Sequence, residues 1–297
     1  MKRAAIIVAV LGMCVWSFAQ DKAAQSTPAA GAAQTAPVGK RPPQAKTQPE
    51  FDAYKAAIAL TDPDAIEKAA TDFATKYPDS ELRVVLFKAA MQKYQQVNNA
   101  DKMLEMAQKA LTYDPDDPEA LLGVAQVLAE RTRDTDLDKD QRLAEAKKDA
   151  EHALSTIDTD LPTVGYPPDQ LNAFKGFLRS EAYAVLGTLA SNAKNWPDAE
   201  TNLRKSIDAF PQQVDSVAVL RLAVALDMQS KYPEALKYAN QAVDLTKDHA
   251  DSPAGKAARA EQDRLTKLNM GSAPGQNAAP SAQNASPSGQ SSAPDKK

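Results

Sequence analysis

Small and apolar residues recur at helical spacing between residues 180 and 213. Four of them fall three, four and seven positions apart, at Tyr183, Leu186, Gly187 and Ala190. This spacing places them on one face of a helix, and a second stretch repeats it at Ala199, Leu203 and Ser206. A glycine inside an exposed helix costs about 1 kcal/mol relative to alanine. Gly187 is therefore predicted to lie where the second helix of a hairpin approaches the first closely.

The same pattern returns 36 residues later. Every position of the first hairpin has a counterpart there, at Val219, Leu222, Ala223, Leu226, Ala235, Ala239 and Ala242. The turn is repeated as well, since Trp196-Pro197-Asp198-Ala199 becomes Tyr232-Pro233-Glu234-Ala235. Proline and an acidic residue both suit the first turn of a helix, where an N–H is unpaired and negative charge is favourable. The chain is therefore predicted to contain an internal repeat.

This repeat resembles the tetratricopeptide repeat, which has an aromatic residue, Leu-Gly, another aromatic residue, and then Ala, a bulky residue, Ala and Pro over about 34 residues. Tyr183, Leu186, Gly187 and Pro211 match the first unit closely, as do Ala199 and Leu203. The departures are Ala190 for an aromatic residue, Ser206 for alanine, Ala223 for glycine and Lys247 for proline. The resemblance implies an all-α fold, a right-handed α-solenoid of helix-turn-helix repeats that holds other proteins.

Weaker versions of the pattern predict five units and a final helix. Their approximate bounds are 50–83, 84–117, 118–160, 168–213, 214–249 and, for the capping helix, 252–269. The third unit contains an insertion near Arg131–Asp140, and a loop at Leu161–Pro168 lengthens the next connection. Long connections in a tight array often carry function. The alternative is a generic alanine-rich helical bundle.

Residues 1–19 are typical of a secretory signal peptide. Lys2 and Arg3 precede an apolar run, and Ser17-Phe18-Ala19 offers a small-residue cleavage site. We therefore predict an exported protein, periplasmic or secreted. Cys14 lies within this segment and raises the alternative of a lipid-anchored protein, although Met13 before it fits poorly. Cleavage after Ala19 removes Cys14 and leaves no thiol.

The segments that flank the repeats are rich in Ala, Pro, Gln and Ser. Residues 20–49 and 270–297 contain almost no bulky apolar residue, so they are predicted to be disordered. The formal charge of the chain is −4 and becomes −6 without Lys2 and Arg3. A nucleic-acid partner is therefore not expected.

Few residues suggest catalysis. The two histidines, His152 and His249, lie among charged residues with no nucleophile placed beside them by the sequence. No cysteine or histidine pair has the spacing of a zinc site. The sequence therefore indicates neither an enzyme nor a cofactor.

An acidic stretch in the third unit has the spacing of a calcium loop. Its carboxylates are Asp134, Asp136, Asp138, Asp140 and Glu145. Lys139, however, occupies the place of the glycine that the loop requires for its turn. The alternative is a solvated turn in which Asp138 or Asp140 caps the next helix.

The first helices of successive units are expected to line a concave face. The polar residues that lie off their packing stripe form a candidate groove, comprising Lys88, Gln92, Gln95, Gln126, Thr188, Asn192 and Arg221. Amide groups of this kind suit hydrogen bonds to an extended peptide. We therefore predict a non-enzymatic scaffold that binds a protein or peptide partner. The alternative is an envelope-assembly or cell-wall factor that is tethered to a membrane and acts through its tails.

Overall fold

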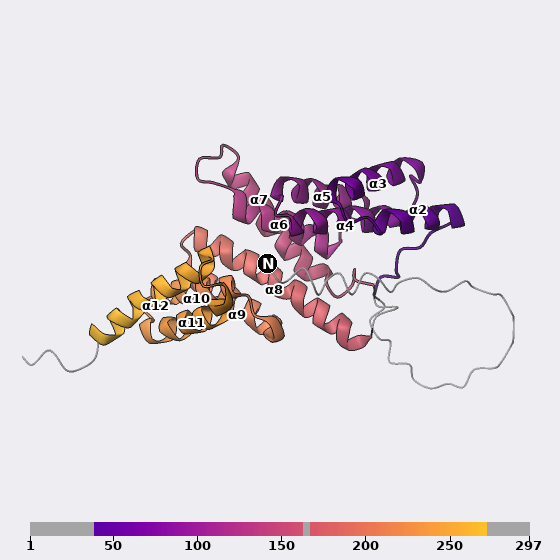
Figure 1. Cartoon of the computed structure of the whole chain (residues 1–297). Coiled ribbons are helices and arrows are strands. Elements are labelled where there is room, and N and C mark those ends of the chain that lie inside the picture. The colour runs from indigo at the N-terminus through magenta and orange to yellow at the C-terminus, as the bar shows by residue number, and fades with distance from the viewer. Residues whose placement is uncertain (1–38, 163–166, 272–297) are drawn as a thin grey trace, which may run out of the picture.

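Helices form every regular element of the part of the chain that the computed structural model describes, residues 39–162 and 167–271 (Figure 1). Five helix pairs follow one another along the chain, and a final helix closes the array. The pairs are α2 (Gln48–Ile58) with α3 (Pro63–Lys76), α4 (Leu82–Gln96) with α5 (Ala100–Tyr113), α6 (Pro118–Arg131) with α7 (Lys139–Thr156), α8 (Pro168–Asn192) with α9 (Trp196–Ala209), and α10 (Ser216–Asp227) with α11 (Tyr232–Thr246). The final helix is α12 (Pro253–Gly271). This is the predicted α-solenoid of tetratricopeptide-like units.

Three of the five turns within the pairs share one backbone conformation. Asn98, Lys194 and Ser230 have positive φ angles of 57°, 56° and 60°, respectively. In each turn the N–H of the next residue donates to the carbonyl five positions earlier, at 2.9–3.0 Å, as helices do when they end on a left-handed residue. Lys194 and Ser230 are 36 residues apart, so the sequence repeat is also a repeat of the backbone.

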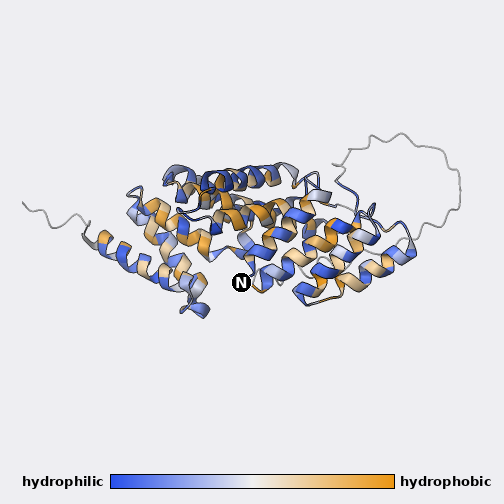
Figure 2. Ribbon diagram, turned by 90° about the horizontal axis from the view of Figure 1, so that it is seen from above, coloured by the Kyte–Doolittle hydropathy of each residue, from blue (hydrophilic) through white to orange (hydrophobic). Residues whose placement is uncertain are grey.

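Small residues allow the paired helices to approach closely. A Cβ atom on Gly187 would lie 2.7 Å from Cγ of Leu203 on α9, so no larger residue fits without a shift. Ala223, which takes the place of this glycine in the next unit, is fully buried. The predicted close packing at Gly187 is confirmed. The second helices contribute a ladder of fully buried alanines, namely Ala107, Ala110, Ala146, Ala150, Ala153, Ala199, Ala235, Ala239 and Ala242. Figure 2 shows apolar residues gathered where helices face one another.

The long helix α8 links the two halves of the array. It has 25 residues, and Val185 in its middle packs into the core of the first three units. Its N-terminal part packs through Phe174 and Phe177 around Leu178, beside α6 and α7. Phe177 also contacts Phe210 in an edge-to-face arrangement, with ring centroids 5.9 Å apart. In Figure 1, α8 crosses between the first three pairs and the last two.

Residues 39–49 correct the prediction that the linker is disordered up to residue 49. Gly39–Lys46, which we call the strap, lies against the solenoid, and α2 already begins at Gln48. Thr47 caps α2 by accepting the N–H of Glu50 at 3.3 Å, while Glu50 accepts the N–H of Lys46 at 2.7 Å. Farther from α2, the N–H of Lys40 donates to the carbonyl of Thr159 at 3.0 Å, and Ala45 packs against the core. Local and distant contacts therefore fix a segment that has no apolar pattern.

Several predictions fall outside the described residues. These concern the signal peptide, the lipidation of Cys14, residues 20–38 of the linker and the tail after residue 271. Within the described residues, no helix combines the length and the apolar character needed to cross a bilayer.

Candidate functional site

Two of the seven predicted groove residues hold neighbouring helices together, and a third, Thr188, bonds within its own helix. The amine of Lys88 lies 2.8 Å from Asp117 and 2.6 Å from Glu119, at the start of α6. The amide of Gln92 donates to the same Glu119 at 3.2 Å. Thr188 is buried and donates to the carbonyl of Ala184 at 2.8 Å. Internal partners therefore use the polar groups of these three side chains, and their place in a partner-binding groove stays a prediction.

The contact of Lys88 with two acids is a buried ion cluster that we call the central seam. The side chains of Lys88, Asp117 and Glu119 are 12%, 7% and 10% exposed. Burial by itself lowers the pKa of Lys88, but the two carboxylates outweigh it and raise that pKa above its usual value. Lys88 therefore stays charged, and the central seam joins α4 to α6.

Gln95 and Gln126, in contrast, meet at a small hollow, which we call the rim pocket. It lies between the α4–α5 turn and the C-terminal part of α6. Its lining consists of Gln95, Asn98, Asn99, Ala100, Met103, Gln126, Val127, Glu130 and Arg131. Its volume is about 60 Å³. Pockets for drug-sized ligands usually have about 300–1,000 Å³, so the rim pocket suits a single side chain better than a cofactor.

Local sequence explains why these polar groups converge. Asn98 takes the left-handed conformation that ends α4, and Asn tolerates this conformation better than most residues. The side chain of Asn99 then caps α5 by accepting the N–H of Lys102 at 3.2 Å. On α6, Gln126 and Glu130 are one helical turn apart and therefore share a face. The rim pocket thus combines amide donors and acceptors with one carboxylate and one guanidinium.

Arg221 and Asn192 lie near the same edge of the solenoid. Arg221 on α10 is half-buried, and this burial lowers its pKa, whereas the carboxylate of Glu130 in the rim pocket raises it. Asn192 is exposed at the end of α8, two residues before Lys194. Lys194 adds to the lowering of the pKa of Asp134, which arises mainly from the hydrogen bond of Asp134 with Lys139. Helix α8 itself packs against both α6 and α7.

Seven lining residues were not predicted from the sequence, and four of them are polar, namely Asn98, Asn99, Glu130 and Arg131. The Asn98-Asn99 dipeptide follows the apolar stripe of a helix, which is a recognisable turn signal. No comparable signal marks Glu130 and Arg131, because their position depends on how α6 stacks on α4 and α5.

The acidic loop does not form the calcium site that its spacing suggested. Helix α7 begins at Lys139, so Glu145 lies on a helix and not in a loop. Lys139 contacts Asp134 at 2.7 Å, and Asp136 accepts the N–H of Arg133 at 2.8 Å. No group of three potential metal ligands converges in the described residues. The loop is closer to the alternative, a solvated turn, although the side chain of Asp138 makes no capping hydrogen bond to α7.

The histidines lie apart from any catalytic arrangement in the described chain. Nε2 of His152 lies 2.9 Å from Asp116. The nearby hydroxyl of Ser155 donates to the backbone carbonyl of His152 and not to its ring. His249 is exposed in a short 3-10 helix, η2 (Lys247–His249).

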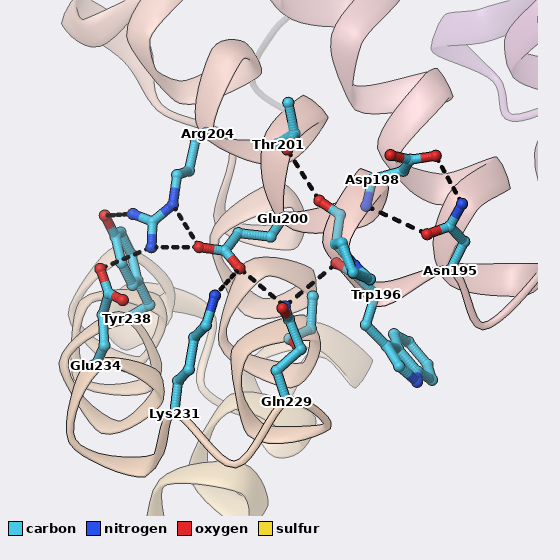
Figure 3. Close-up of polar contacts among 12 residues, drawn as sticks. Asn195, Trp196, Asp198, Glu200, Thr201, Arg204, Gln229, Lys231, Glu234 and Tyr238 are labelled. Atoms are coloured by element: carbon cyan, nitrogen blue, oxygen red, sulfur yellow. Dashed lines mark hydrogen bonds and ion pairs between the residues drawn. The ribbon is translucent and has the colours of Figure 1, made fainter.

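A second charged cluster joins α9 to the following pair, and we call it the outer network (Figure 3). Its centre is Glu200, which accepts hydrogen bonds from Arg204, Gln229 and Lys231 at 2.6–3.1 Å. Arg204 also donates to Glu234 and to the hydroxyl of Tyr238. Burial raises the pKa of Glu200, but the three donors lower it more, so its pKa lies below the usual value. These groups satisfy one another, which indicates a structural role.

No protein-family model matches the chain, and no curated protein is significantly similar to it. Among solved structures, YrrB, described as a TPR protein with an unusual peptide-binding site, is 16% identical, with a TM-score of 0.44 over 69% of this chain and 86% of that one. PilF of Pseudomonas aeruginosa is 18% identical, with a TM-score of 0.46 over 76% and 96%. TTC0263 of Thermus thermophilus, a thermophilic TPR protein, is 12% identical, with a TM-score of 0.45 over 74% and 100%. At this level of similarity, the partners of these proteins do not transfer to this chain, whose own helix pairs define its fold.

Proposed function

We propose that this protein is a non-enzymatic scaffold that binds a protein or peptide partner at the rim pocket. The observation that carries the proposal is the convergence of Gln95 and Gln126 with Asn98 and Glu130 around a hollow the size of one side chain. Amide groups pair with the donors and acceptors of a peptide backbone, and a small hollow receives one anchoring side chain. Binding then requires surface complementarity and no chemical step.

The surroundings of the rim pocket support a docking surface. Val97 in the adjacent turn is 59% exposed, which leaves an apolar contact beside the polar lining. Glu130 and Arg131 carry opposite charges, so the pocket favours neither a strongly acidic nor a strongly basic anchor. We therefore expect a polar or mixed anchoring side chain, with apolar contacts at Val97.

A photocrosslinking experiment in the native cell tests this assignment. A photoreactive amino acid replaces Gln95 in one variant and Lys148, which is exposed on α7, in the matched control. We expect Gln95 to give an adduct with a defined protein and Lys148 to give none with that protein. Combining the Gln95 crosslinker with Gln126→Ala should lower the adduct yield about tenfold if Gln126 is an energetic hot spot. Equal labelling from both positions would contradict the proposal.

The cellular setting is part of the proposal, and the signal-peptide sequence of residues 1–19 supports export to the periplasm or the exterior. The alternative function, in which a membrane-tethered protein acts through its tails, predicts a different result. A variant without residues 21–38 retains all residues of the strap and of the rim pocket. Capture of the partner should survive this deletion if the rim pocket binds it, and should be lost if the tail does.

A further inference from the structure

The strap crosses three successive connections of the solenoid at the edge opposite to the rim pocket. It starts beside Thr159, after α7, passes Asp114, after α5, and reaches Glu81, before α4. These connections join one unit to the next, whereas the rim pocket lies at the turns inside the units. We call this edge, with Glu81, Asp114 and Asp160, the acidic edge.

Two cations of the strap make all its ion pairs with the acidic edge in the described structure. The amine of Lys40 lies 2.5 Å from Asp114 and 3.6 Å from Asp160. Both terminal nitrogens of Arg41 donate to the carboxylate of Glu81, one of them at 2.8 Å. This two-point geometry is the characteristic contact of arginine with a carboxylate. It also lowers the pKa of Glu81, mainly through the hydrogen bond from Arg41.

Main-chain contacts accompany the charges. The N–H of Lys40 donates to the carbonyl of Thr159 at 3.0 Å, and the N–H of Gln44 donates to Glu81 at 3.3 Å. Pro42 and Pro43 keep the segment between Lys40 and Gln44 extended, so little conformational entropy is lost when this segment binds the solenoid. These are features by which proteins recognise extended peptides in general.

The ion pair of Arg41 with Glu81 faces solvent, whereas Asp114 and Asp160, the partners of Lys40, are 17% and 23% exposed. The side chains of Lys40 and Arg41 are 37% and 62% exposed, and Glu81 is 41% exposed. Exposed ion pairs are weak individually and are screened by salt. Apart from Ala45, which packs against the core, the strap is therefore held by polar contacts that another peptide of the same chemistry can replace.

We propose that the acidic edge is a docking site for an extended Lys-Arg-Pro segment of a partner protein, and that the strap occupies it as an internal mimic. This site is separate from the rim pocket and does not depend on the function proposed there. The strap then lowers the apparent affinity of the acidic edge for an external peptide, since that peptide must displace the strap to bind.

Binding of a labelled synthetic peptide with the sequence of residues 39–47 tests the proposal. Fluorescence anisotropy compares the whole chain with K40E/R41E, in which the strap is repelled from the acidic edge. We expect K40E/R41E to bind the peptide about tenfold more tightly than the unaltered chain, because the internal competitor is lost. The affinity should fall steeply between about 0.05 M and about 0.5 M salt.

Variants of the acidic edge provide the matched comparison. In the K40E/R41E background, E81Q/D114N should weaken peptide binding about tenfold, because it removes two charge-assisted contacts. D134N/E145Q removes the same number of negative charges from the α6–α7 loop and α7, and should change nothing. If K40E/R41E does not fold, K40Q/R41Q gives the same comparison without repulsion. A folded strap variant that binds no peptide would overturn the proposal, and so would equal weakening by the two pairs of substitutions.

Discussion

The two halves of the solenoid join their units by different chemistry. In the first half, the central seam of Lys88, Asp117 and Glu119 links α4 to α6 with side chains that are at most 12% exposed. In the second half, the outer network links α9 to the α10–α11 turn through Glu200 and to α11 through Arg204. Glu200 is 15% exposed, and its charged partners are 30–44% exposed. A buried charge that loses its partner is costly, whereas exposed pairs contribute little each. Neighbouring units can therefore stack in the same way while the loss of stability on removing one charged residue differs greatly between the two halves.

The two halves also differ in how well their turn residues suit the left-handed conformation. Asn98 in the first half suits the left-handed conformation, but Lys194 and Ser230 in the second half adopt it at a conformational cost. The left-handed turn is thus better fitted by its residue at position 98 than at positions 194 and 230. Hydrogen exchange read separately for each helix is the appropriate measurement, because unfolding of repeat arrays is often not two-state.

The largest expected effect is at the central seam. Lys88→Ala should lower the local stability of α4 and α6 by about 3–5 kcal/mol, because Asp117 and Glu119 would be left buried without a cation. Hydrogen exchange of α4 and α6 measures this loss. Lys148→Ala on the exposed face of α7 is the control and should stay within about 0.5 kcal/mol of the unaltered chain.

A rescue variant separates charge from packing. K88M/D117N/E119Q replaces the three charges but keeps an oxygen at residue 117, which caps α6 by accepting the N–H of Ala120. This variant should regain most of the lost stability, since neutral groups of similar size often replace a buried ion cluster without penalty. A triple variant as unstable as Lys88→Ala would show that the charges themselves are required.

A smaller effect is expected in the outer network. Glu200→Gln should cost about 1 kcal/mol at low salt, because the partners of Glu200 remain hydrated. The pKa of Glu200 is lowered in the folded chain, so its contribution is present above the ordinary glutamate value of about 4.3 and is lost as the pH falls through the lower folded pKa. The stability difference between the two chains, measured in α9 to α11, should therefore shrink as the pH falls from about 5 toward 3. A difference that grows in this range would contradict the assignment.

The smallest expected effect is a gain in stability. Lys194→Asn places in the α8–α9 turn the residue that the first half already has at position 98, and should stabilise α8 and α9 by about 0.5 kcal/mol. Asn98→Lys is the reciprocal change and should cost α4 and α5 a similar amount. Changes of the same sign in both variants would show that side-chain contacts, and not the backbone conformation, determine the preference.

The predictability of this chain from its sequence depends on the distance over which each interaction acts. The helix pairs and the close contact at Gly187 follow from apolar spacing within a single unit, so they could be predicted. The roles of Lys88 and Gln92 could not, because Glu119 comes from the next unit and reaches them through the relative position of α4 and α6. Similarly, the order of the strap depends on partners 37 to 120 residues away, from Gln44 with Glu81 to Lys40 with Asp160. Composition alone therefore indicated disorder there.

Part of the candidate site could be predicted from the sequence for the same reason. Gln95 and Gln126 were found because each lies off the packing stripe of its own helix. Glu130 lines the rim pocket only because α6 stacks beside the α4–α5 turn, and no local sequence pattern indicates this. A polar residue on a first helix can serve a partner or the next unit, and stacking geometry decides between these two roles.

The strap also determines where a mechanical load would enter the protein. A pull on the chain before Gly39 would act first on the contacts of Lys40 with Thr159 and Asp114, beside the ends of α7 and α5. The contacts of Arg41 with Glu81 would follow, and α2 would bear tension last. The contacts would break one after another from the N-terminal side, so the strap would extend under force while the helix pairs stayed intact.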